Sequence, residues 1–304
     1  VGDMQDWKRQ KAAFASIAVS PVAWLFAFFI LPLAIVWLYS FGRNVGLTEI
    51  DISGTFSNYG RALEPLYLEI FGKSVAVAAL TTLICLIIGF PIALAITFAQ
   101  PKWRPWMLLA IMLPFWTNLL IRTYALITVL RTEGYVNKSL GWFWEGASSL
   151  KVMVGMAPLS TWEPLPLLYN NFAVILGLVY VHLPFMVLPL YSALDRLDRS
   201  LLEASLDLGA GHVRTMVQVV MPLALPGIAS GILITFIPAL GAYLTPDLLG
   251  GPDSQMIANI IERQFKRAND WPFGAALSFL LMYMTFIAIA LQALLSKRKA
   301  EARS

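Results

Sequence analysis

The chain has 304 residues, of which 58% are hydrophobic and only 13% are charged. Soluble globular domains have roughly 45–50% apolar and about 25% charged residues, so this composition excludes an ordinary soluble domain and predicts a membrane protein. The net charge of +4 does not indicate nucleic-acid binding, because most of the Lys and Arg residues lie beside apolar segments.

Six apolar windows are long enough to cross the hydrocarbon core of a bilayer, which takes about 20 residues of helix. They predict transmembrane helices at 17–41, 73–98, 106–130, 171–193, 224–246 and 273–295. The first window is longer than the apolar core of a signal peptide, so we expect it to remain as a membrane helix. We therefore predict an all-α integral membrane protein with one six-helix domain at 17–295, a cytoplasmic N-terminal segment at 1–16 and a basic tail at 296–304.

The distribution of basic residues predicts the orientation of these helices. If both termini lie on the same side, the segments of that side (1–16, 99–105, 194–222 and 296–304) hold twelve Lys and Arg in 61 residues. The three connections on the other side hold eight in 97 residues. Because Lys and Arg accumulate on the cytoplasmic side of membrane proteins, the N and C termini are predicted to be cytoplasmic.

One cytoplasmic segment, "SLLEASLDLGAGHVRTMVQVVMP" (200–222), interrupts the apolar sequence. Ser200 and Glu203 have the spacing of a capping box, so we expect a short helix that begins at Ser200. Gly209 allows the chain to turn before a second short helix, which should end before Pro222 and the fifth span. The leucines of this segment predict apolar surface for a soluble partner to cover. From the residues alone, an ordinary solvated connector is an equally good interpretation.

This segment resembles the "EAA" loop of permease subunits of bacterial ATP-binding-cassette importers. That pattern is Glu-Ala-Ala, three residues, Gly, nine residues, Ile, one residue and Leu-Pro. The matching positions here are Glu203, Ala204, Ser205, Gly209, Val219, Met221 and Pro222. Ser205, Val219 and Met221 depart from the pattern by small or isosteric changes.

The resemblance implies the importer-permease fold and a coupling role for residues 200–222. In that family the loop docks on an ATPase subunit, so Glu203 would dock or cap and Gly209 would hold the turn. The implied partners are a second, homologous permease subunit, two ATPase subunits and a periplasmic or extracellular substrate-binding protein. ATP would bind to the partner ATPase, and no cofactor to this chain. The implied location is the bacterial inner membrane, in contact with its lipids.

Three longer stretches resemble the spermidine and putrescine permeases, which are the polyamine branch of these importers. They are "PFWTNLLIRTYA" (114–125), "VYVHLPFMVLPLYSAL" (179–194) and "LLGGPDSQMIANIIERQF" (248–265). Related permeases for ferric iron, thiosulfate or opines share much of this sequence, so the resemblance leaves these solutes as alternatives.

A polyamine is a linear polycation, and its route through a membrane needs carboxylates, oxygen dipoles or aromatic faces in place of water. The candidates for this route are Asp247, Tyr243, Trp116, Asn118, Tyr124 and Tyr180. For the aromatic residues, an interfacial belt or helix packing is the alternative interpretation. For Asp247, the alternative is an ordinary loop carboxylate.

Arg122 and His182 are ionisable residues within predicted spans. An arginine at the centre of a membrane helix costs roughly 2.5–3.5 kcal/mol on insertion scales. Arg122 would lie about 24 Å along a straight third helix, so we expect a structural role in which it reaches the outer headgroups or pairs with a loop acid. His182 is interpreted as a hydrogen-bonded structural residue rather than a proton relay.

The fifth span carries a face of small residues, Gly227, Gly231, Thr235 and Ala239, at every fourth position. Such a face permits close approach of another helix. Simple helix packing is one interpretation, and an interface with the second permease subunit is the other.

The sequence lacks the residues that nucleotide binding, metal binding or catalysis would need. "FGKS" (71–74) and "GAGHVR" (209–214) each match only part of a nucleotide-binding motif. Two histidines and one cysteine predict no metal site. We therefore expect no enzyme activity in this chain. A secondary transporter driven by an ion gradient remains an alternative, but it would not need the 200–222 segment.

Overall fold

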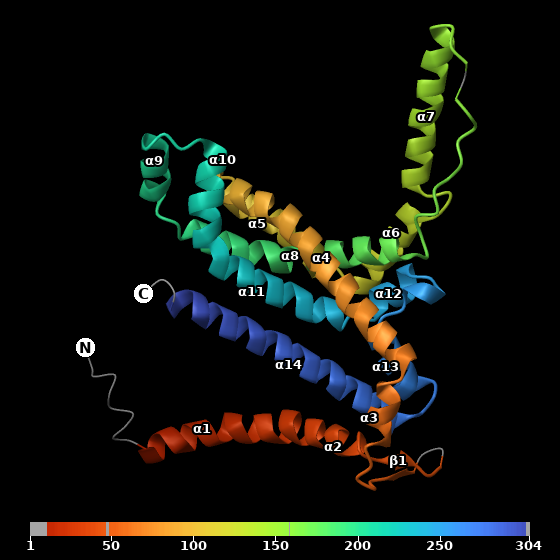
Figure 1. The fold of residues 1–304 in the computed structure, drawn as a ribbon, viewed down its shortest axis with the longest axis vertical. Helices are drawn as coiled ribbons and strands as arrows, with labels where there is room; N and C mark the ends of the chain where they lie inside the picture. Colours follow the sequence, from red (N-terminus) through yellow and green to blue (C-terminus); the bar gives the residue numbers. More distant parts are fainter. Residues whose placement is uncertain (1–10, 47–48, 158, 302–304) are drawn as a thin grey trace. The chain divides into compact units, whose positions relative to one another are not determined.

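The computed structural model describes residues 11–46, 49–157 and 159–301. Parts of the predicted terminal segments, residues 1–10 and 302–304, lie outside the described residues. The described chain is mostly helical (Figure 1). In chain order the elements are α1 (Lys11–Leu25), η2 (Phe26–Ile30), α2 (Leu31–Tyr39), β1 (Arg43–Asn44), β2 (Ile50–Asp51), α3 (Ser57–Ala62), α4 (Pro65–Phe98), α5 (Arg104–Trp116), α6 (Leu119–Leu130), α7 (Tyr135–Met153), α8 (Asn171–Asp195), α9 (Arg199–Asp207), α10 (His212–Thr215), η3 (Met216–Val220), α11 (Met221–Leu240), α12 (Leu244–Leu249), η4 (Pro252–Ser254), α13 (Ile257–Lys266) and α14 (Trp271–Glu301).

Five helical stretches in the described chain are long and apolar enough to cross a membrane. They are Ile17–Tyr39, Pro65–Phe98, Asn171–Asp195, His212–Leu240 and Trp271–Ala290. A further apolar stretch is made by α5 together with the helices that follow it, Leu119–Met153, and this pair is bent by 93°, as in a broken span or a re-entrant loop. The predicted total of six spans is met when the bent pair counts as one span.

The third predicted span, 106–130, is therefore not one straight helix. Pro114 lies near the end of α5, and both the N–H and the hydroxyl of Thr117 donate to its carbonyl, at 3.2 and 2.7 Å. Asn118 then adopts an extended backbone (ψ 136°), and its side chain accepts a hydrogen bond from the N–H of Leu120 at 2.8 Å. Asn118 is thus the N-cap of a new helix, α6, and the chain changes direction there.

Two π-helical segments occur inside longer helices, and a proline follows each at the same spacing. The N–H of Leu31 donates to the carbonyl of Phe26, and the N–H of Met221 donates to that of Met216. Pro32 and Pro222 come next in the sequence. A helical proline lacks the N–H for its own bond and crowds the carbonyl four residues earlier. The extra residue of a π-turn lets the helix continue past the proline.

The chain divides into two compact units, where the sequence predicted a single membrane domain at 17–295. The larger unit comprises residues 66–260 and 287–304. Its main core cluster is formed by α8 together with α4 and the η3–α11 helix. The fully buried side chains of this cluster include Cys85, Ala93, Ile96, Met186, Val187, Leu190 and Ala224.

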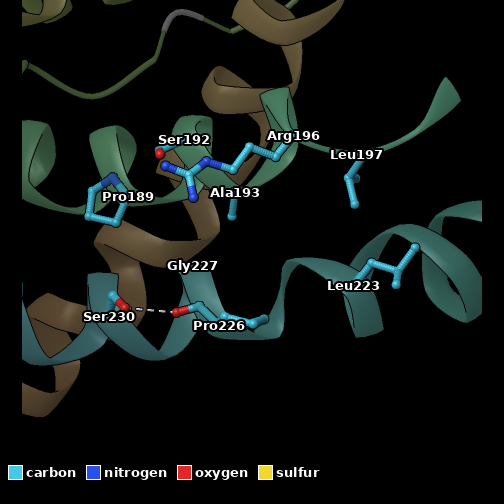
Figure 2. Close-up of a pocket in the computed structure, with 9 residues that line it drawn as sticks. All are labelled: Pro189, Ser192, Ala193, Arg196, Leu197, Leu223, Pro226, Gly227 and Ser230. Atoms are coloured by element: carbon cyan, nitrogen blue, oxygen red, sulfur yellow. Dashed lines mark hydrogen bonds between the residues drawn. The ribbon is translucent and has the colours of Figure 1, made fainter. Parts of the chain in front are cut away.

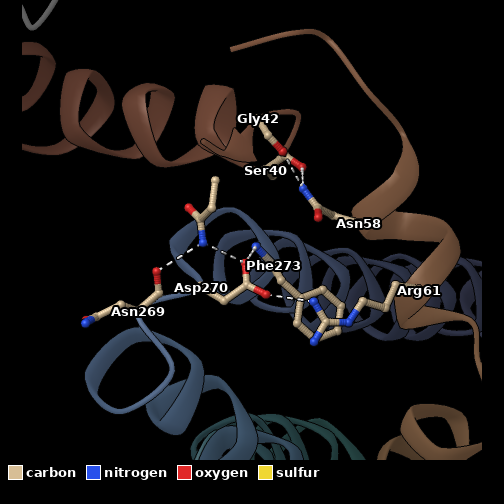
Figure 3. A network of polar contacts seen from close by, with 8 residues as sticks. Ser40, Gly42, Asn58, Arg61, Asn269, Asp270 and Phe273 are labelled. Carbon is tan, nitrogen blue, oxygen red and sulfur yellow. Dashed lines mark hydrogen bonds and ion pairs between the residues drawn. The ribbon is translucent and has the colours of Figure 1, made fainter. Parts of the chain in front are cut away.

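The smaller unit comprises residues 1–65 and 261–286, and a network of polar contacts joins its distant parts (Figure 3). Arg61 of α3 forms an ion pair with Asp270 at 2.7 Å, and its guanidinium lies 3.8 Å from the ring centre of buried Phe273. Asn44 donates to the carbonyl of Asn269 at 3.2 Å. These contacts hold the β1–β2 hairpin and α3 against the beginning of α14.

Candidate functional site

The predicted helix–turn–helix at 200–222 exists, but its first helix begins earlier than expected. α9 starts at Arg199, and its N-cap is Asp198. The Asp198 carboxylate accepts a hydrogen bond from the N–H of Ser200 at 2.9 Å, which lowers the pKa of this exposed carboxyl. The prediction that Ser200 caps the helix was wrong. Ser200 lies inside the first turn, because Asp198, an equally good cap residue, precedes it and accepts the first N–H.

The turn after α9 depends on Gly209. Its φ angle is +81°, in the left-handed region that glycine adopts without steric cost. Its N–H donates to the carbonyl of Leu206 at 2.9 Å, and the N–H of Ala210 donates to that of Ser205 at 3.1 Å. This pair of bonds is a Schellman motif, which ends the helix and satisfies its last carbonyls.

The second helix of the motif is not short, which corrects the sequence prediction. α10, η3 and α11 form one continuous helix from His212 to Leu240, and it is among the membrane-spanning candidates. Pro222 lies in the first turn of α11, directly after the π-turn, so it does not end the helix. The turn is therefore joined to the fifth span by continuous helix.

A side-chain hydrogen bond fixes the two helices on either side of the turn. The hydroxyl oxygens of Ser205 and Thr215 lie 2.9 Å apart, and Thr215 is buried. The EAA pattern has Ala at the position that Ser205 occupies here. The serine hydroxyl contributes a hydrogen bond that alanine could not form.

The tip of the motif presents apolar side chains to its surroundings. Leu208 is 88% exposed and Val213 is 78% exposed, and Leu201, Leu206 and Val217 are also exposed. Glu203 and Ala204 lie on the same short helix and are exposed as well. The motif projects from the ends of α8 and α11 (Figure 1). Apolar side chains on such a projection are suited to fill a cleft in a partner protein.

A cavity of about 460 Å³ lies between α8 and α11 near the base of this projection (Figure 2). Its lining includes Pro189, Ser192, Arg196, Leu223, Pro226 and Ser230. The side chain of Arg196 extends over Ser192, and the Ser230 hydroxyl donates to the carbonyl of Pro226 at 2.8 Å. Sequence reasoning did not identify this cavity, because it forms only when the two helices pack together.

Arg104 was also missed as a residue of this region. Its guanidinium pairs with Asp195 at 3.1 Å and donates to the carbonyls of Thr97 and Ala99 at 2.6 and 3.1 Å. It therefore joins the end of α4, the start of α5 and the end of α8. These bonds hold the end of α8, three residues before the N-cap of α9.

The small-residue face of α11 is used inside the chain. A Cβ atom at Gly227 would collide with Ala193 and with the carbonyl of Pro189, and one at Gly231 would lie 2.7 Å from the sulfur of Met186. Thr235 and Ala239 are completely buried. The face packs against α8, so these residues are not available for an interface with a second permease subunit.

The candidate substrate-route residues lie on or beside four helices of the larger unit, α5, α6, α8 and α12. Trp116, Asn118 and Tyr124 lie around the bend between α5 and α6, where Asn118 is the N-cap. Tyr180 lies on α8. Tyr243 and Asp247 share the first turn of α12, where the N–H of Asp247 donates to the carbonyl of Tyr243 at 3.0 Å. All six are exposed, so the chain alone presents them on its surface and does not enclose them.

Arg122 lies on α6, one turn after the bend. Its Nε and Nη1 atoms are buried and have no hydrogen-bond partner among the described residues. The side chain lies close enough to His182 of α8 for an electrostatic interaction. His182 is itself buried, and its Nδ1 lies 2.8 Å from the carbonyl of Leu178, in line with the predicted structural role. Because α6 turns away from α5, Arg122 is not where a straight helix would put it.

The fold and this motif define a class: a helical membrane protein that carries a projecting helix–turn–helix with an exposed apolar tip. The family "Binding-protein-dependent transport system inner membrane component" matches residues 12–301, so the chain belongs to this family. It is the permease of an ATP-binding-cassette importer, as the EAA-like segment predicted, and it is a multi-pass protein of the inner membrane. Its relatives are transport permeases and not enzymes.

The chain is similar to permease proteins of known transport systems. It is 40% identical over 265 residues to the spermidine/putrescine transport system permease protein PotB of Salmonella typhimurium, with 87% of each chain covered. It is 30% identical to the inner membrane ABC transporter permease protein YdcU of Escherichia coli, with 94% of this chain and 90% of that protein covered. Its fold is similar to a chain in the crystal structure of a bacterial importer of the acidic polysaccharide alginate (TM-score 0.69, 15% identity, 97% and 98% covered).

Proposed function

We propose that this chain is one of two permease subunits of an importer that takes up spermidine and putrescine. The observation that carries the substrate assignment is its 40% identity to PotB over 87% of the chain. Support for the route comes from Trp116 at the end of α5, Tyr124 on α6 after the bend, and Asp247 on α12, which packs against α6. Aromatic faces and a carboxylate suit an ammonium group.

The transport step is alternating access driven by ATP on two partner ATPase subunits, with both termini of this chain in the cytoplasm. The projecting motif at 198–215 docks on an ATPase subunit through exposed Leu208 and Val213. Because its second helix continues into the fifth span, closure of the ATPase pair moves α11 directly. A substrate-binding protein delivers the polyamine from the other side of the membrane. ATP binds to the partner, and this chain forms no covalent intermediate.

The carboxylates of the route come largely from the second permease subunit. The six apolar windows of this chain contain no Asp or Glu, and Asp247 lies one residue beyond the fifth. A polycation in a low-dielectric environment needs compensating negative charge. This chain therefore contributes aromatic and carbonyl groups, and its partner contributes most of the charge.

Uptake in cells tests this function. Labelled spermidine and putrescine are supplied to cells with and without this gene, in a strain that lacks other polyamine importers, with ferric iron and thiosulfate uptake measured in parallel. We expect a selective loss of polyamine uptake that the wild-type chain restores. Unchanged polyamine uptake with loss of another solute would reassign the substrate within the same importer class.

A Gly209→Pro variant in the same assay tests coupling. Proline cannot adopt a φ angle of +81° and lacks the N–H that donates to Leu206. We expect normal membrane insertion, loss of uptake and loss of the co-purified ATPase subunit. Full uptake by this variant would show that coupling does not need the Gly209 turn, and uptake in cells without the ATPase would instead indicate an ion-gradient transporter.

A further inference from the structure

The helix α7 forms a hairpin with a segment that follows it, residues 159–169. Asn137 of α7 is buried, and its side-chain amide donates to the carbonyl of Leu165 at 3.0 Å and accepts a hydrogen bond from the N–H of the same residue at 2.9 Å. The indole N–H of Trp144 donates to the carbonyl of Ser160 at 2.8 Å. One face of α7 is therefore covered by the chain itself.

The opposite face of α7 carries large apolar side chains. At 3.6 residues per turn this face holds Tyr135, Trp142, Phe143, Leu150 and Met153, which we call the α7 stripe. These side chains are between 64% and 85% exposed. Charged residues lie on the flanks between the two faces, Lys138 and Glu145 on one flank and Lys151 on the other. The helix is thus amphipathic, and the chain leaves its apolar stripe uncovered.

The hairpin lies at the beginning of α8, which is the opposite end of that helix from the projecting motif. The side-chain amide of Asn170, the N-cap of α8, donates to the carbonyl of Pro166 in the segment 159–169. α8 has 25 residues and is about 37 Å long at 1.5 Å per residue, enough to cross a hydrocarbon core of roughly 30 Å. The base of the hairpin therefore lies at one membrane surface and the projecting motif at the other.

The direction of α7 turns its stripe toward the membrane. Figure 1 shows α7 running across the direction of α8, so α7 lies roughly in the membrane plane. Residues 159–165 run along α7 on the side away from α8 and α11 (Figure 1). The stripe is on the other side of α7, so it faces the bilayer that α8 and α11 cross.

The chemistry of the α7 stripe favours lipid over protein. Contacts between membrane helices are enriched in small residues, whereas this stripe consists of Tyr, Trp, Phe, Leu and Met side chains. A soluble protein outside the membrane would approach from the side that residues 159–169 already cover. Trp and Tyr accumulate at the membrane–water interface, and Trp, Phe and Leu form the apolar face of helices that lie in it.

We infer that α7 lies in the headgroup layer of the membrane, on the side opposite the projecting motif, with the α7 stripe inserted among the acyl chains of the lipids. Helices of this kind bury their apolar face about 5–10 Å into the boundary between headgroups and chains. Lys138 and Lys151 on the flanks then reach the lipid phosphates. The membrane surface thereby holds the end of α6, to which residues 131–134 join α7.

Fluorescence quenching by lipid tests this position. Cys85, the single cysteine of the chain, is replaced by alanine, and a fluorescent label is attached to one new cysteine in the importer, which is reconstituted in lipid nanodiscs with cysteine-free partner subunits. The stripe variants are Phe143→Cys and Leu150→Cys, and the matched flank controls are Glu145→Cys and Lys151→Cys. We expect lipids brominated in the upper acyl chain to cause a larger loss of fluorescence at the stripe than at the flanks. Iodide in the water should have the reverse effect.

All four label positions are exposed, so the labels leave the packing of the hairpin in place. The inference is overturned if lipid quenches the stripe and flank labels equally, or if iodide quenches the stripe labels as much as the flank labels. It is also overturned if the stripe labels are shielded from both quenchers, because a protein then covers the stripe, and omission of the substrate-binding protein or of the second permease identifies which one. These outcomes do not depend on the transported solute, so the test stands if the substrate assignment fails.

Discussion

The hydroxyl groups of Ser205 and Thr215 form a hydrogen bond of 2.9 Å that joins α9 to α10 across the Gly209 turn. The bond connects the part of the chain that projects toward a partner with the helix that crosses the membrane. Thr215 is buried, so its hydroxyl loses water when the motif folds, and the loss of its partner leaves it unsatisfied.

The Ser205 and Thr215 bond predicts coupled effects of two mutations. A net intramolecular hydrogen bond contributes about 0.5–1.5 kcal/mol. We expect Ser205→Ala and Thr215→Val each to slow uptake, and the double variant to be no slower than the worse single variant. A double-mutant cycle on spermidine-stimulated ATP hydrolysis by the purified complex measures this coupling. Strictly additive losses would mean that the bond does not transmit the movement.

The turn itself predicts a difference between Gly209 and Gly211, two glycines of the same loop. Alanine in the left-handed region costs about 1–2 kcal/mol, and Gly209 has a φ angle of +81°. Gly211 has a φ angle of −69° and open space around its Cβ position. We therefore expect Gly209→Ala to reduce uptake and Gly211→Ala to leave it unchanged. Equal uptake by the two variants would show that the positive φ angle at Gly209 does not matter for transport.

The contact between α8 and α11 predicts an order of stability among glycine variants. A Cβ at Gly227 meets the backbone carbonyl of Pro189, which cannot move aside, whereas one at Gly231 meets the flexible side chain of Met186. Overpacking of a core costs about 1–3 kcal/mol. We expect Gly227→Ala to lower the midpoint of thermal unfolding in detergent more than Gly231→Ala does. Gly241→Ala, whose nearest neighbours are 3.9 Å away, is the control.

The N-cap of α9 predicts a dependence on pH. The Ser200 N–H lowers the pKa of the Asp198 carboxyl in the folded chain. A carboxyl with a lowered folded pKa adds stability above its unfolded pKa, about 3.9, and loses it as pH falls through the folded value. We expect hydrogen exchange in α9 to be slower in wild type than in Asp198→Ala at pH 7, with the difference vanishing in strong acid. Asp198→Asn, which keeps a cap without a charge, should remove the pH dependence.

Five of the six predicted spans coincide with long apolar helices of the described chain, because a bilayer demands about 20 apolar residues and few charges. The third crossing differed because Asn118 can either lie within an apolar helix or cap a new one. Apolar content is the same in both cases, so hydropathy does not distinguish them. The helix at Tyr135–Met153 was not predicted, since it lies outside the apolar windows.

In the candidate coupling segment, too, the sequence predicted some features correctly and left others undetermined. The glycine at 209 and the acidic start of the segment indicated a helix, a turn and a second helix, since these depend on neighbouring residues. The choice of Asp198 over Ser200 as N-cap also depends on near neighbours, but both residues are acceptable caps. Only the three-dimensional arrangement selects between them.

The sequence by itself determined that this protein is helical, that it lies in a membrane and that it carries the segment of an importer permease. Composition and local spacing decide these properties, because burial in lipid and helix capping act over a few residues. Folding in three dimensions decided which partners each side chain meets: Thr215 for Ser205, and α8 for Gly227 and Gly231 of the small-residue face. Such contacts join residues far apart along the chain, and their energies depend on packing and distance, which the order of residues does not express.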